Sequence, residues 1–230
     1  MQKPIARPAF SLLHATARLP HGWCDAAAEW ADKCDHPENC EYLLVIDFRD
    51  RERRPNVSCW RERIWIQQLV NLDRPCTVDA WNLAARVSTG SILVEIADDW
   101  YPCDHWDTRI LDLLNGDVNQ EAVVWPSCEF QPRLITHPII TRAYYERPGR
   151  GGCAGELLYP EYISVGSDDD FTEYALRDSV VRGLPYYFEH RHRFNGMAPD
   201  DAVYRHTNRQ EAWDVKDRVL ARRRKDGFSK

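Results

Sequence analysis

An apolar run that stops at two adjacent carboxylates is the feature that most limits how this chain can fold. Residues 92–97 (ILVEIA) have the length and character of a buried strand, and Asp98 and Asp99 follow directly. Open α/β sheets bind ligands at the carboxyl ends of their strands. Divalent cations are often held there by carboxylates together with substrate phosphates. The pair is therefore a candidate metal–diphosphate site; the alternative is that both aspartates only begin a loop.

Length and composition favour a single folded domain. A chain of 230 residues with 43% apolar residues can bury one sizeable core and is not a disordered chain. The net charge of −6 excludes a generic binder of polyanions, although basic residues form local clusters. These clusters are residues 49–54, 142–150, 190–193 and 222–225.

The eight cysteines show neither a CxxC pair nor the Cys–His spacing of a zinc module. The first residues do not read as a signal segment, and no apolar run approaches the ~20 residues of a membrane span. We therefore expect a cytoplasmic protein with reduced cysteines and no membrane span. A disulfide role is the alternative.

Strand and helix patterns alternate along the chain. Expected strands cover residues 10–15, 42–46, 65–70, 92–97, 122–125 and 184–190. Expected helices cover residues 23–34, 78–87, 104–114, 171–182 and 210–225, with a helix start at 141–146. This alternation predicts an α/β fold with a mostly parallel central sheet and helices on both faces.

Acidic residues occur in the order Asp47, Asp98–Asp99 and the triplet at 168–170, and the histidines at 190 and 192 follow them. With the segments around them, this order resembles that of family 2 glycosyltransferases of the GT-A fold. The segments that carry it are FSLLHATAR at 10–18, VID at 45–47, DAWNLAARVSTGSILVEIADDW at 79–100 and DDDFTEYALRDSV at 168–180. Together they span residues 10 to about 209.

The resemblance implies one Rossmann-like GT-A domain over residues 1–230. It implies a nucleotide-sugar-binding half at about 8–100, an acceptor and catalytic half at about 101–209, and a C-terminal helix at about 210–225. The implied enzyme is an inverting hexosyl- or pentosyltransferase. It would move a sugar from a nucleoside-diphosphate sugar, expected to be a UDP-sugar, to a hydroxyl acceptor with the help of Mn²⁺ or Mg²⁺.

Five residues are implied to lie near the nucleotide sugar. Thr16 and Arg18, in the turn after the first strand, would lie against the base and ribose. Asp47, at the end of the second strand, would read the base. Asn82 and Arg86 lie on the helix before the aspartate-bearing strand, where the family places residues near the nucleotide sugar.

Asp98 and Asp99 stand where the family has its DxD motif, with Asp98 on the nucleotide-sugar side and Asp99 as the metal ligand. The chain departs from the pattern, because it reads DDW. His190 or His192 would supply the late metal ligand, and the HRHR run does not separate the two. The alternative for this run is a solvated basic surface.

The triplet at residues 168–170 resembles the acidic motif that provides the catalytic base. By register Asp169 and Asp170 match it, and Asp170 is the favoured base. A positioned carboxylate can take the proton of the acceptor hydroxyl, while a metal ion offsets the charge on the departing diphosphate. The alternative is that these acids only cap the helix that begins at Phe171.

The sequence is compatible with more than one acceptor and with two other functions. The acceptor could be a glycan or a small molecule; a less usual alternative is a hydroxymethylated DNA base, as in phage-type DNA modification, which only the compact length, the clustered arginines and the abundant aromatics support. A nucleotidyltransferase is a second reading, but the TARLPHG turn after the first strand lacks the expected glycine- and lysine-rich loop. A third is a non-catalytic binding module with a GT-A-like fold.

Overall fold

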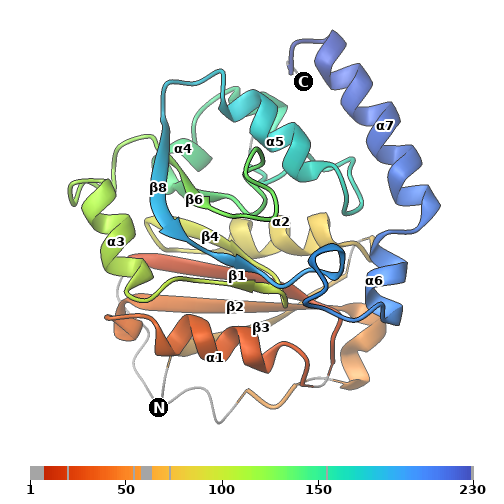
Figure 1. The fold of residues 1–230 in the computed structure, drawn as a ribbon, viewed down its shortest axis with the longest axis horizontal. Helices are drawn as coiled ribbons and strands as arrows, with labels where there is room; N and C mark the ends of the chain where they lie inside the picture. Colours follow the sequence, from red (N-terminus) through yellow and green to blue (C-terminus); the bar gives the residue numbers. More distant parts are fainter. Residues whose placement is uncertain are drawn as a thin grey trace.

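Within the described part of the chain, a seven-stranded sheet has the order β3-β2-β1-β4-β7-β6-β8 (Figure 1). The computed structural model describes residues 8–19, 21–53, 55–57, 64–72, 74–153 and 155–228. Neighbouring strands are parallel except at β7, which is antiparallel to both β4 and β6. The strands are β1 (Phe10–Thr16), β2 (Cys40–Asp47), β3 (Trp65–Asn71), β4 (Ile92–Ile96), β6 (Val123–Ser127), β7 (Ile139–Thr141) and β8 (Val181–Tyr187).

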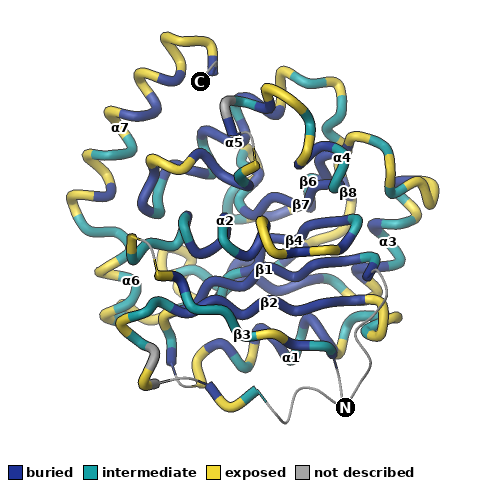
Figure 2. Tube along the Cα trace, turned by 180° about the vertical axis from the view of Figure 1, so that it is seen from behind, coloured by how far each residue is buried: buried dark blue, intermediate teal, exposed yellow. Residues whose placement is uncertain are grey.

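Helices cover both faces of this sheet, which explains the nearly continuous apolar sequence of its central strands. Alternate residues of a strand point to opposite faces. Leu12 and Leu44 face a core formed with α1 and α3, whereas Leu13 and Leu43 face a core formed with α2 and α5. Figure 2 shows β1, β2 and β4 buried along their lengths. The helices are α1 (Cys24–Asp32), α2 (Thr77–Val87), α3 (Trp106–Leu113), α4 (Arg142–Tyr145), α5 (Ser167–Ala175), α6 (Ala202–Thr207) and α7 (Gln210–Lys225).

The predicted α/β class, with a mostly parallel sheet covered on both faces, is confirmed. Strands were found in all six expected regions, and the last helix has the predicted bounds. Among the described residues, no helix has both the length and the apolar character needed to cross a lipid bilayer.

The region after the acidic triplet differs from the prediction. A helix was expected over 171–182, but α5 ends at Ala175 and residues 181–187 form β8. This strand pairs in parallel with β6, and most of its side chains are exposed. An edge strand with little buried surface gives no clear apolar alternation, so the sequence predicted a strand only from residue 184 and assigned the first residues of β8 to the helix.

A second, two-stranded sheet positions the late histidines. Strand β5 (Trp100–Tyr101) pairs in antiparallel fashion with β9 (Glu189–His190), and Trp100 lies opposite His190. The backbone N–H of Arg191 donates to the carbonyl of Asp99 over 2.8 Å. These backbone contacts bring His190 beside the aspartates that follow β4, although about 90 residues separate them in sequence.

The seven described cysteines are free thiols. The sulfur atoms of Cys34 and Cys40 lie 3.7 Å apart at a hydrogen-bond contact, and Cys59 lies outside the described residues. Among the described residues, the group of possible metal ligands that the structure forms contains no cysteine.

Candidate functional site

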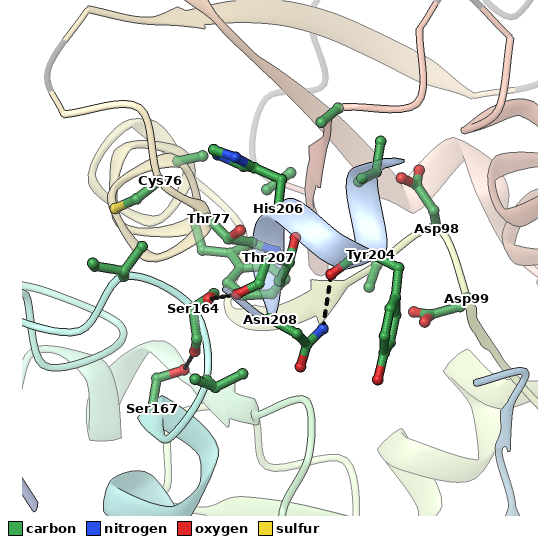
Figure 3. Close-up of a pocket in the computed structure, with 18 of the residues that line it drawn as sticks. Cys76, Thr77, Asp98, Asp99, Ser164, Ser167, Tyr204, His206, Thr207 and Asn208 are labelled. Atoms are coloured by element: carbon green, nitrogen blue, oxygen red, sulfur yellow. Dashed lines mark hydrogen bonds between the residues drawn. The ribbon is translucent and has the colours of Figure 1, made fainter. Parts of the chain in front are cut away.

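A cavity of about 680 Å³ opens at the carboxyl ends of β1, β2 and β4, where the sequence predicted a ligand site. Its walls also include the N-terminal ends of α2 and α5 and helix α6 (Figure 3), together with the loop before β7. Eight residues proposed from the sequence line it: Thr16, Arg18, Asp47, Asp98, Asp99, Asp169, His190 and His192. Three others do not: Asn82, Arg86 and Asp170.

Both carboxylate oxygens of Asp98 are engaged by side chains of β1. His14 Nε2 lies 2.9 Å from Oδ1, and the Thr16 hydroxyl donates to Oδ2 over 3.0 Å. His14 is fully buried, and its Nδ1 contacts the hydroxyl of Tyr42. Figure 3 shows the carboxylates of Asp98 and Asp99 pointing apart. Asp98 therefore ties the end of β4 to β1, and Asp99 is the carboxylate left for a ligand.

Asp99, His137 and His190 form a compact group of possible metal ligands. One ligand atom from each residue lies within 4.8 Å of the other two. His190 Nε2 lies 3.6 Å from Asp99 Oδ2. His137, in the loop before β7, places Nδ1 2.9 Å from Oε1 of the buried Glu95. One carboxylate and two imidazoles converging at a cavity wall are a donor set that can bind a divalent cation.

The charges of this group follow from its burial. Burial acts to lower the pKa of His190, but the bond to Asp99 and the neighbouring Cys128 raise it to about 9. Burial acts to raise the pKa of Asp99, but the bond to His190 holds that pKa below its usual value. Burial, and then the positive charge of His190, lower the pKa of His137 to about 3. His137 is therefore a neutral imidazole at pH 7, the form that binds metals, whereas His190 must release its proton when it binds a cation.

His192, the other histidine proposed as a metal ligand, lies outside this group. Its ring stacks on Phe130 with centroids 5.0 Å apart and an interplanar angle of 25°. Its Nδ1 accepts a hydrogen bond from the backbone N–H of Phe194 over 3.3 Å. The geometry thus separates the two histidines of the HRHR run: His190 joins Asp99, and His192 forms part of the cavity wall.

The acidic triplet divides between the cavity and the core. Asp168 and Asp169 line the cavity, but Asp170 is only 1% exposed. Its Oδ1 and Oδ2 lie 2.8 and 3.0 Å from the guanidinium nitrogens of the equally buried Arg223. Because successive helical residues are rotated by about 100°, Asp170 points away from the side that Asp168 presents. The expectation that Asp170 is the catalytic base is therefore corrected: Asp170 holds α5 to α7.

Asp168 has the surroundings of a proton acceptor. Burial, and then the negative charge of Asp169, raise the pKa of Asp168 to about 6. Its Oδ1 accepts a hydrogen bond from the backbone N–H of Asp169 over 3.0 Å. Asp169 itself forms an ion pair with Lys216. Of the two triplet acids that line the cavity, Asp169 is paired with Lys216, whereas Asp168 forms no ion pair with a described residue, so its carboxylate can accept a proton near neutral pH.

The opposite side of the cavity contains the residues expected near the nucleotide. Asp47 accepts hydrogen bonds from the backbone N–H and the guanidinium of Arg49, at 3.1 and 3.3 Å. Arg18 forms an ion pair with Asp201, the residue that caps α6, and its Nε lies 3.7 Å from Asp98. Arg18 thus joins the turn after β1 to α6.

Helix α6 was not predicted, yet it forms one wall of the cavity (Figure 3). Tyr204, His206 and Thr207 all line the cavity. The helix has six residues without a buried side chain, so no apolar stripe marked it in the sequence. The sequence feature that marks the start of α6 is its N-cap Asp201, whose side chain accepts a hydrogen bond from the backbone N–H of Tyr204 over 2.7 Å.

Asn82 and Arg86 hold a loop to α2 and do not reach the cavity. The Asn82 side chain is 1% exposed and bonds the carbonyl and the N–H of Leu158, at 3.0 and 2.9 Å. Arg86 binds both carboxylate oxygens of Glu156, at 2.7 and 2.8 Å. The prediction that these two residues lie at the nucleotide sugar is therefore corrected. Sequence spacing placed them on the right helix, but their side chains serve the loop that follows α4.

Neither the protein-family models nor the curated proteins contain a match to this chain. Solved structures do resemble it. TarS 1–349 of S. aureus in complex with UDP-GlcNAc aligns with a TM-score of 0.59 and 14% identity, over 78% of this chain and 57% of that chain. The mannosyltransferase PcManGT from Pyrobaculum calidifontis, in complex with GDP-Man and Mn²⁺, aligns with a TM-score of 0.57 and 14% identity, over 94% of this chain and 65% of that chain.

The chain spans less than two thirds of the length of either protein. At such low identity the likeness concerns the fold, and substrates cannot be carried over from it. It confirms the fold class that the sequence resemblance implied: the chain is a single α/β domain with the fold of GT-A glycosyltransferases.

Proposed function

We propose that this protein is a metal-assisted glycosyltransferase that moves a sugar from a nucleoside diphosphate to a hydroxyl group. The observation that carries the proposal is the convergence of Asp99, His137 and His190 in the cavity that Asp168 also lines. A cation-binding group and a candidate base in one cleft are the parts that such a transfer needs. Two proteins with this fold were solved with UDP-GlcNAc and with GDP-Man and Mn²⁺, which supports the same chemistry here.

In this proposal the donor binds across the ends of β1, β2 and β4, the half of the chain at about 8–100. Asp47 faces the nucleobase, while Thr16 and Arg18 border the ribose and the diphosphate. Asp99 and His190 hold the cation. A bound divalent cation offsets the negative charge that develops on the departing diphosphate. Asp98 acts through its bonds to His14 and Thr16, which fix the direction of Asp99.

Asp168, rather than the Asp170 that the sequence resemblance indicates, takes the role of general base. It removes the proton of the acceptor hydroxyl as that oxygen attacks the sugar carbon. The acceptor approaches from the side opposite the diphosphate, so the configuration at that carbon is inverted. The raised pKa of Asp168 suits this step, because a base works best when its pKa lies near the working pH.

The surface supports a glycan or small-molecule acceptor rather than DNA. Among the described side chains, the arginines of the basic clusters are largely neutralised by carboxylates of the same chain, which leaves little positive charge there for phosphates. The pairs are Arg49–Asp47, Arg147–Asp178, Arg191–Glu29, Arg193–Asp200, Arg222–Glu161, Arg223–Asp170 and Arg224–Glu173. Phe194 and Trp213 line the cavity and are partly exposed, and such aromatic faces can stack on a sugar ring.

Replacing Asp99 by Ala tests the proposal. A panel of UDP- and GDP-sugars is added to the wild-type protein with Mn²⁺ or with EDTA, and the melting temperature is measured. We expect one donor to raise the melting temperature more strongly with Mn²⁺, because a ligand that binds only the folded state stabilises it. Asp99→Ala should lose the Mn²⁺-dependent part of this shift and about 10³-fold in turnover, since the cation supplies several kcal/mol.

Asp112→Ala, at an exposed position of α3, is the matched control and should behave as the wild type. A full Mn²⁺-dependent shift in Asp99→Ala would show that the cation binds elsewhere. A nucleotidyltransferase would instead consume a nucleoside triphosphate and a sugar phosphate. A non-catalytic module would bind a donor without ever releasing the nucleoside diphosphate.

A further inference from the structure

We propose that His137 is a third protein ligand of the cation and that Glu95 is its positioning residue, so that the site selects Mn²⁺, Co²⁺ or Zn²⁺ over Mg²⁺. The inference deepens the proposed function, because it concerns the cation of the same cavity. Neither residue was singled out by the sequence. The isolated histidine of the segment THPIIT and the glutamate inside the strand at 92–96 matched no motif.

The first support is the position of Glu95. It lies within β4, where the other residues are apolar, and it is 2% exposed. A buried carboxyl group is costly unless it has a polar partner. The partner of Glu95 Oε1 is His137 Nδ1, at 2.9 Å, while Oε2 is buried without a hydrogen bond to any described residue. Glu95 is thus aimed at the ring of His137.

Sheet pairing fixes this contact. The backbone N–H of Glu95 donates to the carbonyl of Pro138 over 3.0 Å, and Val94 lies opposite Ile139 in the β4–β7 pair. His137 therefore enters the cavity wall directly beside Glu95. The register of the sheet, rather than a flexible loop, sets the distance between the two side chains.

The ring of His137 is held in one orientation. Because Glu95 occupies Nδ1, Nε2 is the nitrogen left for the cation. The indole rings of Trp81 and Trp100 pack against the imidazole, with centroids 5.8 and 5.1 Å away. The ring centroid of His190 lies 5.7 Å away. A carboxylate on the far nitrogen of a ligating histidine fixes its tautomer and orientation, and its loss typically lowers metal affinity about 10–100-fold.

The donor set determines the preference among cations. Two imidazole nitrogens and one carboxylate oxygen suit transition metals, whereas Mg²⁺ takes oxygen ligands and keeps several waters. Among divalent first-row cations, affinity generally increases from Mn²⁺ through Co²⁺. With Asp99 and His190 alone the site would hold one imidazole, and the discrimination against Mg²⁺ would be weaker.

Direct metal binding tests the inference without any donor. Titration calorimetry with MnCl₂ and MgCl₂ is performed on the metal-free protein and on Glu95→Gln, His137→Asn and the control His36→Asn. His36 is exposed, with its side chain on the surface before β2. We expect the wild type and His36→Asn to bind Mn²⁺ at least about tenfold more tightly than Mg²⁺. Glu95→Gln should weaken Mn²⁺ binding by about 10–100-fold, and His137→Asn should remove most of the Mn²⁺ preference.

Electron spin-echo spectroscopy of bound Mn²⁺ gives a readout that a purely structural role would not change. The wild type should show nitrogen couplings from two imidazoles, and His137→Asn from one. The number of imidazole couplings in the wild type tests the proposal even if a variant does not fold. Thermal melting of each variant in EDTA shows whether it folds. A single imidazole coupling in the wild type, or wild-type Mn²⁺ affinity in folded His137→Asn, overturns the role of His137; wild-type affinity in folded Glu95→Gln overturns the role of Glu95.

These outcomes are separate from a failure of the proposed function. If a donor is turned over with Mn²⁺ while both variants bind Mn²⁺ normally, only the ligand assignment fails. If two imidazoles bind Mn²⁺ as described but no nucleoside-diphosphate sugar is bound or consumed, the assignment stands and the transferase proposal fails.

Discussion

Replacing Asp168 by Asn is expected to lower kcat for sugar transfer by about 10²–10⁴-fold, the usual contribution of a general base. The amide fills the same space but cannot take a proton from the acceptor hydroxyl. Binding of Mn²⁺ and of the donor should change little, because Asp168 lies outside the group formed by Asp99, His137 and His190. The measurement is steady-state transfer with the donor identified in the binding panel, together with calorimetric donor affinity.

Asp169→Asn is the matched control, since Asp169 is the neighbouring acid of the same cavity but pairs with Lys216. It should reduce transfer less than about tenfold, as expected for loss of a partly exposed ion pair. Wild-type transfer in Asp168→Asn would contradict the assignment of Asp168 as the base. A larger loss of transfer in Asp169→Asn than in Asp168→Asn would give the role of base to Asp169.

The pH profile of the wild type offers an independent check. The base acts only when it is deprotonated, so activity is retained above its pKa and lost as the pH falls through it. Burial and the charge of Asp169 place the pKa of Asp168 at about 6. We therefore expect kcat/KM to fall by tenfold per pH unit below about 6. A profile that stays flat down to pH 4.5 would contradict Asp168 as the base.

Asp170→Ala is expected to lower the free energy of unfolding by about 3–5 kcal/mol, because it leaves the guanidinium of Arg223 buried and uncompensated. Each of the two side chains is 1% exposed, and they share two hydrogen bonds. Unfolding in urea, followed by tryptophan fluorescence, measures the change. The protein that remains folded should keep its kcat, since Asp170 does not line the cavity.

A second pair between α5 and α7 serves as the control. Glu173 and Arg224 also form an ion pair, but their side chains are 33% and 55% exposed. Glu173→Ala should therefore cost less than about 1 kcal/mol. The double variant Asp170→Leu with Arg223→Met should recover part of the lost stability, because apolar replacement of a buried pair is often tolerated. If Asp170→Ala instead abolished transfer at unchanged stability, Asp170 would be the base after all.

The sequence predicted the parts of the fold that depend on burial. Residues 42–46 and 92–97 are apolar because helices cover both sides of their strands, so the run itself indicates a strand. The parts it missed are short or mostly exposed. The first residues of β8, which exposes most of its side chains, were assigned to a helix; β7 is buried but has three residues, and α6 buries no side chain. Such elements leave no period in the sequence.

The site could be predicted only where position along a strand decides it. Asp47 is the last residue of β2 and Asp99 lies in the turn after β4, and the carboxyl ends of parallel strands meet at one edge. The direction of a side chain within a helix was the weak point. Two residues apart on α5, Asp168 faces the cavity and Asp170 faces the core. His137 was not predictable, because its role depends on the register of β7 against β4.

The central claim is that the cavity turns over a nucleoside-diphosphate sugar with the help of a cation held by Asp99. Release of UDP or GDP from a panel of their sugars, followed over time with Mn²⁺ or with excess EDTA, tests it most directly. The account predicts that at least one donor is consumed with Mn²⁺ and that EDTA or Asp99→Ala stops the release. Release that persists in EDTA and in Asp99→Ala, or no release from any donor, would contradict it.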